Sequence, residues 1–199
     1  MASFSHKYFL FIFLLVLHTN ISSEIEDEIV VTGDWREIKK SDKDSSLKIF
    51  DQTYLNKNQV KHFEDLTYSI PNLNFAASDS RPRYFQIRGI GERSGYEGTP
   101  NSSVGFLIDD IDFSGQGGIA SSYDIQQVEI YRGPQGSRMG ANALAGLIYI
   151  KTNDPEDIFE VKANLTFGDF GRKDFGGSIN IPINEKFKYR FSFKKEDMD

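Results

Sequence analysis

The sequence has 199 residues, enough for one domain of ordinary size with attached segments. The formal net charge of −6 argues against a nucleic-acid partner, because phosphate backbones are bound by basic faces and the chain has no basic stripe. Cysteine is absent, which excludes a disulfide framework, a thiolate metal site and a thiol nucleophile. Aromatic residues make up 14% of the chain, and this high share indicates a surface that meets lipid or a large ligand.

The first 23 residues have the pattern of an export signal. His6 and Lys7 precede an apolar run over residues 8–17, and small polar residues follow before the acidic Glu24. An apolar run of this length is about half of what spans a bilayer as a helix. We therefore predict a cleaved signal peptide over residues 1–23, serving export through the Sec pathway, rather than a membrane anchor.

Residues 24–46 divide into a β-prone peptide and a polar linker. The peptide Glu-Ile-Val-Val-Thr at residues 28–32 favours an extended strand but is too short to build a sheet alone. A tethered peptide of this kind can add itself to the exposed sheet edge of a partner. Residues 34–46 are rich in Lys, Asp and Ser, which predicts a solvated linker. The other interpretation is that residues 28–32 are the first strand of the domain that follows.

Residues 47–155 have the pattern of a small α/β domain. Strands are predicted near residues 47–51, 84–90, 104–111, 128–132 and 147–152. One or two short helices are predicted after residue 51 and must end before Pro71. Glycine-rich stretches at residues 89–98 and 114–118 separate these elements and predict loops.

After Pro155 the pattern changes to strict alternation of apolar and polar residues. The alternation covers residues 159–167, 175–183 and 187–194, and predicts three antiparallel strands with one apolar and one polar face. Transmembrane β-barrel walls have this pattern, but so does a soluble antiparallel sheet with one buried face. Residues 168–173 are predicted to form a longer loop than residues 184–186, as in barrels whose long loops face outward.

Four segments, in this order, resemble the TonB-dependent outer-membrane receptors. They are the Ile-Pro-Asn of residues 70–72, the Gln-Ile-Arg-Gly of residues 86–89, the strand at residues 104–111 ending in Asp, and residues 124–152. The last segment reads DIQQVEIYRGPQGSRMGANALAGLIYIKT and is the most specific of the four. The resemblance covers nearly all of the chain after the signal peptide.

The resemblance implies a fold class and a domain order. The fold class is α/β, with a small plug domain of mixed β-sheet and short helices followed by the first antiparallel strands of a truncated transmembrane β-barrel. Residues 24–46 become the TonB box and linker, residues 47–155 the plug, and residues 156–199 the first barrel strands. About three strands cannot close a pore, so we expect a fragment or an incomplete gene product.

The resemblance also implies partners and sites. Glu28, Ile29, Val30, Val31 and Thr32 would form the TonB box that pairs with the periplasmic end of TonB. The outward loops that carry Arg93, Tyr96 and Gln116 would help to bind a small extracellular ligand. The expected location is the outer membrane of a Gram-negative cell, in contact with its lipid. Ferric siderophores, cobalamin and oligosaccharides are candidate ligands.

Three charges of the plug motifs need partners. Arg88, Glu129 and Arg132 lie in or beside predicted strands. A charge buried in a barrel lumen is costly unless it is paired. We therefore expect these side chains to form ion pairs within the plug or polar contacts with the inner wall of the barrel.

No catalytic site or cofactor is predicted. His62 is the only histidine outside the signal region, so no Ser-His-Asp arrangement has a base. The glycines at 133, 136 and 140 lack the Lys-Ser/Thr ending of a phosphate-binding loop. We predict an active-transport receptor and no enzyme. The rivals are a freestanding plug that binds TonB or a partner barrel without transport, and a soluble periplasmic β-rich protein.

Overall fold

The computed structural model describes residues 30–31, 38–39, 46–58, 60, 63–77, 82–94, 101–116, 123–169 and 171–197. The elements in chain order are β1 (Val30–Val31), β2 (Ile38–Lys39), β3 (Leu47–Asp51), α2 (Gln52–Lys57), α3 (Phe63–Thr67), β4 (Leu73–Ala76), β5 (Tyr84–Ile87), β6 (Val104–Ile108), β7 (Ile111–Asp112), β8 (Ile125–Arg132), α4 (Gly136–Met139), β9 (Gly146–Thr152), β10 (Glu160–Phe167), β11 (Lys173–Pro182) and β12 (Lys188–Asp197). The predicted signal peptide lies outside the described residues.

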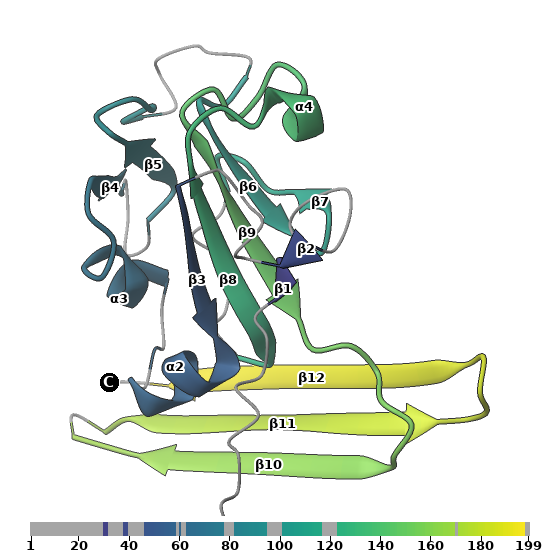
Figure 1. The fold of residues 1–199 in the computed structure, drawn as a ribbon. Coiled ribbons are helices and arrows are strands. Elements are labelled where there is room, and N and C mark those ends of the chain that lie inside the picture. The colour runs from purple at the N-terminus through teal and green to yellow at the C-terminus, as the bar shows by residue number, and fades with distance from the viewer. Residues whose placement is uncertain are drawn as a thin grey trace, which may run out of the picture.

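A mixed five-stranded sheet forms the centre of the first part of the chain (Figure 1). Its strand order is β3-β8-β9-β6-β7, and only β6 and β9 are parallel among its neighbours. Together with the two short helices α2 and α3, this sheet confirms the predicted fold class of a mixed sheet with short helices.

Both faces of this sheet are apolar, and each is covered by different elements. One face, with Phe50, Val128 and Ile148, packs against α2, α3 and the β4–β5 hairpin. The opposite face, with Leu147 and Tyr131, packs around Val31 of β1 and partly buried Met139 of α4. Residues that alternate along one strand therefore serve two cores.

Local sequence signals set the ends of several elements. Asp51 caps α2, because its Oδ1 accepts a hydrogen bond of 2.7 Å from the backbone N–H of Tyr54. The predicted strand at residues 104–111 ends early, at Ile108, because Asp109 and Asp110 both adopt positive φ angles and form a turn. The strand predicted over residues 84–90 likewise ends at Ile87, where Arg88 has φ 55°.

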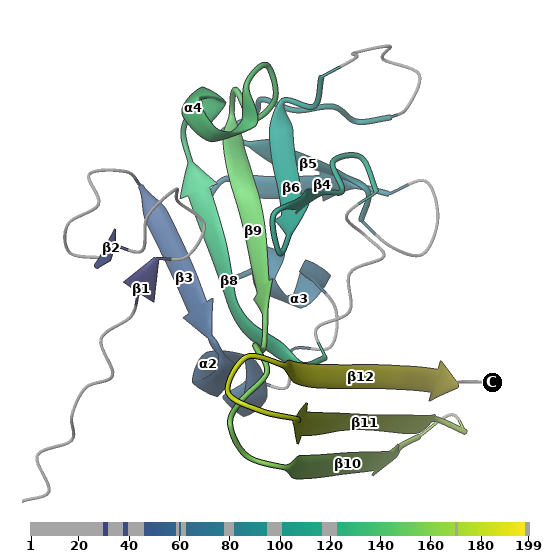
Figure 2. The ribbon, with the colours of Figure 1, turned by 90° about the vertical axis from the view of Figure 1, so that its right-hand side faces the viewer.

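A separate antiparallel sheet, β10-β11-β12, lies beside α2 and the lower ends of β8 and β9 (Figures 1 and 2). Its strands have 8, 10 and 10 residues, so the predicted alternating segments are confirmed as strands. The connections, residues 168–172 and 183–187, are of equal length, so the predicted difference between a long loop and a tight turn is wrong. Asn184 closes the second connection by accepting hydrogen bonds from the N–H groups of Lys186 and Phe187.

This sheet has its apolar side chains on the open face. The register aligns Val161, Ile179 and Phe191 across the three strands, and the next row is Lys162, Ser178 and Ser192. Phe191 and Val161 are 59% and 61% exposed, whereas the polar Ser178 is buried toward the α/β part of the molecule. The arrangement is inverted relative to a soluble sheet, which buries its apolar face.

Among the described residues, no helix combines the length and the apolar character that crossing a bilayer requires.

Candidate functional site

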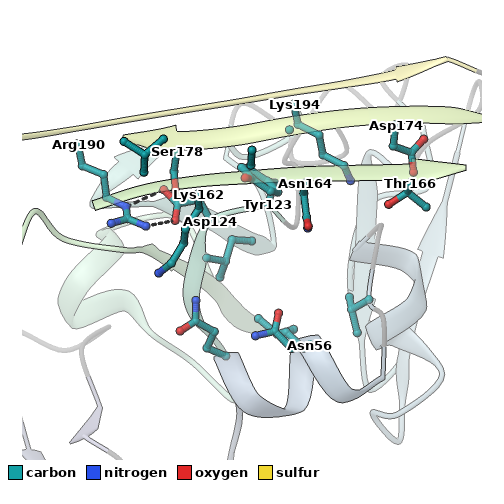
Figure 3. A pocket seen from close by; sticks show the side chains of 17 residues that line it. Asn56, Tyr123, Asp124, Lys162, Asn164, Thr166, Asp174, Ser178, Arg190 and Lys194 are labelled. Atoms are coloured by element: carbon teal, nitrogen blue, oxygen red, sulfur yellow. Dashed lines mark hydrogen bonds and ion pairs between the residues drawn. The ribbon is translucent and has the colours of Figure 1, made fainter. Parts of the chain in front are cut away.

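The polar face of the three-stranded sheet looks onto the α/β unit across a cavity of about 900 Å³ (Figure 3). Lys162 and Asn164 of β10 and Asp174 of β11 point into it from the sheet, and Asn56 of α2 faces them. The wall on the α/β side is mixed, because Leu55, Val60 and Ile125 line it together with Gln52 and Asn56. The sheet therefore supplies most of the charged and polar side chains of the cavity.

One buried ion pair joins the sheet to the α/β unit. Arg190 of β12 donates from Nε to Asp124 Oδ2 at 2.8 Å and from Nη2 to Asp124 Oδ1 at 2.6 Å. The two side chains are only 7% and 9% exposed. Two parallel charge-assisted hydrogen bonds fix orientation as well as distance. Figure 3 shows the pair at one end of the cavity.

Contacts within its own part of the chain also hold Asp124 in position. Its φ of 58° places it in the left-handed region, which Asp and Asn tolerate better than other side chains. Asn153 Nδ2 donates to Asp124 Oδ1 at 2.9 Å. Burial alone raises the pKa of Asp124, but the hydrogen bonds from Arg190 and Asn153 outweigh it, so this pKa lies below its ordinary value.

Two further contacts hold the sheet in place. Asn180 accepts from the N–H of Glu156 and donates to the carbonyls of Glu156 and Ile158, and thereby fixes the segment that leads into β10. Gly176 lies against the ring of Tyr123, and a Cβ on Gly176 would come within 3.1 Å of that ring. The absence of a side chain at Gly176 therefore permits the close approach.

The β1 segment docks on the second face of the five-stranded sheet. Val31 is 0% exposed and packs in the cluster with Leu107, Tyr131 and Leu147. The carbonyl of Val30 accepts a hydrogen bond of 2.9 Å from Gln127 Nε2. β1 also pairs antiparallel with β2, so this short segment is held on more than one side.

The profile of the TonB-dependent Receptor Plug Domain matches residues 39–147. The chain belongs to the TonB-dependent receptors. The α/β unit is thus the plug of this family, and β10–β12 correspond to strands of its barrel, which three strands leave unclosed.

Individual relatives agree with the family. The chain is 22% identical over 182 residues to the vitamin B12 transporter BtuB of Vibrio vulnificus, covering 88% of this chain and 28% of that protein. It is 24% identical over 182 residues to the pesticin receptor of Yersinia pestis, covering 87% of this chain and 26% of that receptor. The chain thus spans about a quarter of the length of these relatives.

Solved structures share the fold. The alcaligin outer-membrane receptor FauA of Bordetella pertussis superposes with a TM-score of 0.67 at 17% identity, covering 85% of this chain and 29% of FauA. The ferripyoverdine receptor of Pseudomonas aeruginosa superposes with a TM-score of 0.69 at 16% identity, covering 85% of this chain and 22% of that receptor.

The residues predicted to bind TonB are described only in part. Val30 and Val31 form β1 in the docked position above, whereas Glu28, Ile29 and Thr32 lie outside the described residues.

The charges predicted to pair have different surroundings. Glu129 is 0% exposed and accepts hydrogen bonds from Gln127 Nε2 at 2.6 Å and Tyr131 Oη at 2.5 Å, so it lies inside the plug and away from the wall. Arg88 is exposed in the turn after β5. Arg132 ends β8, and its N–H donates to the carbonyl of Ser46.

The residues predicted to face the ligand lie on the plug surface where they are described. Arg93 and Gln116 are both exposed, and Tyr96 lies outside the described residues. Glu92, beside Arg93, accepts hydrogen bonds from the N–H and Oγ of Ser103 at 2.9 and 2.7 Å. This contact joins residues 11 positions apart in the chain. Among the described residues, no group of His, Cys, Asp and Glu could hold a metal ion.

The sequence reasoning missed Asp124, Arg190 and Gln127. A signal for Arg190 was present, because its place in the alternation puts a charge on the inward face, where it needs a partner. Gln127 carried no such signal, since its orientation depends on an irregularity in β8.

The orientation of the sheet leads to a prediction about charge. Phe191→Arg places a cation on the apolar outer face, whereas Asn164→Arg places the same cation in the polar cavity. The outer face is expected to meet lipid. For a row near the bilayer midplane, Phe191→Arg should then lower the free energy of unfolding of the full receptor by about 2–4 kcal/mol. Asn164→Arg should lower it by less than about 1 kcal/mol. Unfolding of each variant from lipid vesicles in urea measures this difference, and equal effects would contradict the orientation.

Proposed function

We propose that this chain forms the plug and the first barrel strands of an outer-membrane receptor that takes up a scarce ligand with energy delivered by TonB. The ligand class is a ferric siderophore or cobalamin, because the similar proteins are a vitamin B12 transporter and receptors for alcaligin and ferripyoverdine, with oligosaccharides a further candidate. The observation that carries the proposal is the inverted three-stranded sheet, which turns Phe and Val outward and polar side chains toward a plug.

The proposed organisation follows from these roles. Residues 1–23 direct export through the Sec pathway and are then removed. Residues 24–46 supply the TonB box and linker, residues 47–155 form the plug, and residues 156–199 begin the barrel. TonB pairs with residues 28–32 by adding main-chain hydrogen bonds. A pull on this segment acts on β2 first and then on β3 and α2, because they follow it in the chain in this order.

The cavity beside α2 supports a path for the ligand. Gln52, Leu55 and Asn56 of α2 form one wall of it, and β10 and β11 form the other. Displacement of α2 would widen the space along the polar strands. Arg93 and Gln116, with Tyr96, are proposed to contact the ligand from outside before this step. The protein carries out no catalysis in this scheme.

The freestanding plug is the less favoured alternative. It would leave the apolar face of β10–β12 in water, with Phe167 at 75% and Leu165 at 66% exposure. Apolar patches of this kind mark a membrane or protein interface.

The test is uptake by cells that lack their own receptors and express the full-length protein. Radiolabelled ferric siderophores and cobalamin are supplied in turn, with and without a proton uncoupler. One of these ligands should accumulate, and the uncoupler should stop accumulation while leaving surface binding intact. Accumulation that continues without TonB or the proton gradient would contradict the proposal.

A further inference from the structure

A β-bulge in β8 turns one polar side chain toward β1. The pairing of β8 with β9 shifts register between Ile125 and Gln127, which leaves Gln126 as the extra, exposed residue. Ile125 and Val128 both face the first core, so Gln127 is directed to the opposite face. In a regular strand Ile125 and Gln127 would share a face. Bulges re-aim side chains in this way, often next to functional sites.

The amide of Gln127 is fixed by two acceptors. Its Nε2 donates to the carbonyl of Val30 at 2.9 Å and to Glu129 Oε1 at 2.6 Å. Both contacts run from Nε2 to an oxygen, so the amide presents its NH₂ group to both. Tyr131 Oη donates to Glu129 Oε2 and holds that carboxylate in place. Gln127 is therefore oriented by buried hydrogen bonds rather than by packing alone.

The hydrogen bond between Gln127 and Val30 holds a segment that is already buried and paired. Val31 has no exposed surface, and the carbonyl of Val30 is already an acceptor. β2 lies along β1 in antiparallel register, with Val30 opposite Lys39 and Val31 opposite Ile38. A partner strand can pair only with main-chain groups that are free, so docked β1 is a poor template for addition of a strand.

From this geometry we propose that Gln127 is a latch residue. Positioned by Glu129 and Tyr131, it holds Val30–Val31 against the plug, and TonB pairs with this segment only after the Gln127–Val30 hydrogen bond opens. The gating step rests on the proposed function, whereas the latch itself does not. A plug without the latch would expose the segment whether or not a ligand is bound.

A thiol at position 31 reports the latch. The 199 residues contain no cysteine, so Val31→Cys introduces the only thiol among them. Its reaction with a maleimide is followed in the full-length receptor in detergent, without TonB. Gln127→Leu should raise the labelling rate roughly three- to tenfold, the effect of losing one hydrogen bond on an opening equilibrium. Gln126→Leu, a matched change at the exposed neighbour, should leave the rate unchanged. An unchanged rate with Gln127→Leu overturns the latch.

A second cysteine position and a second substitution distinguish opening of the latch from a general loosening of the plug by Gln127→Leu. Val128→Cys, on the other face of β8 and 1% exposed, reports such loosening. If labelling there also accelerates, Tyr131→Phe decides, because it removes only the hydroxyl that holds Glu129. Tyr131→Phe should raise labelling at position 31 and not at position 128. No rise at position 31 overturns the proposal.

Binding of the purified periplasmic domain of TonB separates the latch from the proposed coupling. Gln127→Leu should strengthen this binding by the same roughly three- to tenfold factor in the absence of ligand. Faster labelling without stronger binding overturns the gating step. If TonB binds neither wild type nor variant, the labelling result still supports the latch, and the proposed function fails instead.

Discussion

Replacement of Val30 by proline is expected to abolish uptake by the full-length receptor while ligand binding at the cell surface stays unchanged. Proline has no N–H, so a strand that carries it cannot donate to a partner at that position, and its ring also restricts the backbone. Val30 lies in β1, far along the chain from the exposed residues Arg93 and Gln116, so the outer loops should keep their structure. Uptake and surface binding of the same radiolabelled ligand give the two readouts.

Val30→Thr is the matched control for this change. Threonine keeps both the N–H and the β-branched side chain, so pairing with a partner strand should persist. Uptake by Val30→Thr should therefore remain within about twofold of wild type, because this partly buried position keeps both its main-chain donor and a side chain of similar shape. Normal uptake by Val30→Pro would show that residues 28–32 do not couple the receptor to TonB.

Helices and strands could be predicted from the sequence where hydrophobic alternation or a capping residue determines them. Residues 47–51 form a strand because Leu47, Ile49 and Phe50 can each reach a core, and Asp51 then caps the helix that follows. The strands at residues 160–167, 173–182 and 188–197 were visible because alternation specifies faces without knowledge of the partner strand.

Turn chemistry limited the accuracy of strand ends. Arg88, Asp109 and Asp110 all adopt positive φ angles, so β5 and β6 each end three residues before the predicted limits. The hairpin of β4 with β5 was also missed, because Leu73–Ala76 is only four residues long and finds its partner after a long connection.

The contacts of the candidate site could not be read from the sequence because they join distant segments. Gln127 and Val30 are 97 residues apart, and Asp124 and Arg190 are 66 apart. The alternation of β12 did imply that Arg190 faces inward, but only the folded chain brings it to Asp124. Glu129 was expected to have a partner, and Gln127 and Tyr131, which both donate hydrogen bonds to it, lie on its own strand.

Removal of one partner of the Asp124–Arg190 pair is expected to loosen the plug from its wall. Arg190→Gln leaves the carboxylate of Asp124 buried without its cation, which should lower the free energy of unfolding by about 3 kcal/mol. Asp124→Asn should have a similar effect and is tolerated sterically, since Asn also accepts the positive φ of this position. Two measurements test both variants: urea unfolding of the full receptor, and hydrogen exchange of the amides along β8.

The pH dependence of this effect has a definite sign. Because the pKa of Asp124 is lowered from 3.8 in the folded state, the pair contributes fully above that value, and its contribution is lost as pH falls through the lower folded pKa. The contribution of Asp124 to wild-type stability should therefore be constant from pH 5 to pH 8. In Arg190→Gln burial raises the pKa of Asp124 instead, so the difference between wild type and variant should grow or stay level as pH rises. A difference that declines across this range would contradict the assigned ionisation.

The pair formed by Lys188 and Asp157 supplies the control that separates burial from charge. It also joins β12 to the segment before β10, at 2.6 Å, but Asp157 is 79% exposed. Exposed ion pairs are worth less than about 1 kcal/mol, because water solvates each charge well when the other is removed. Asp157→Asn should therefore leave both urea unfolding and exchange in β8 nearly unchanged. If it destabilised the receptor as much as Asp124→Asn does, net charge on the sheet, and not the buried contact at Asp124, would hold the plug against β12.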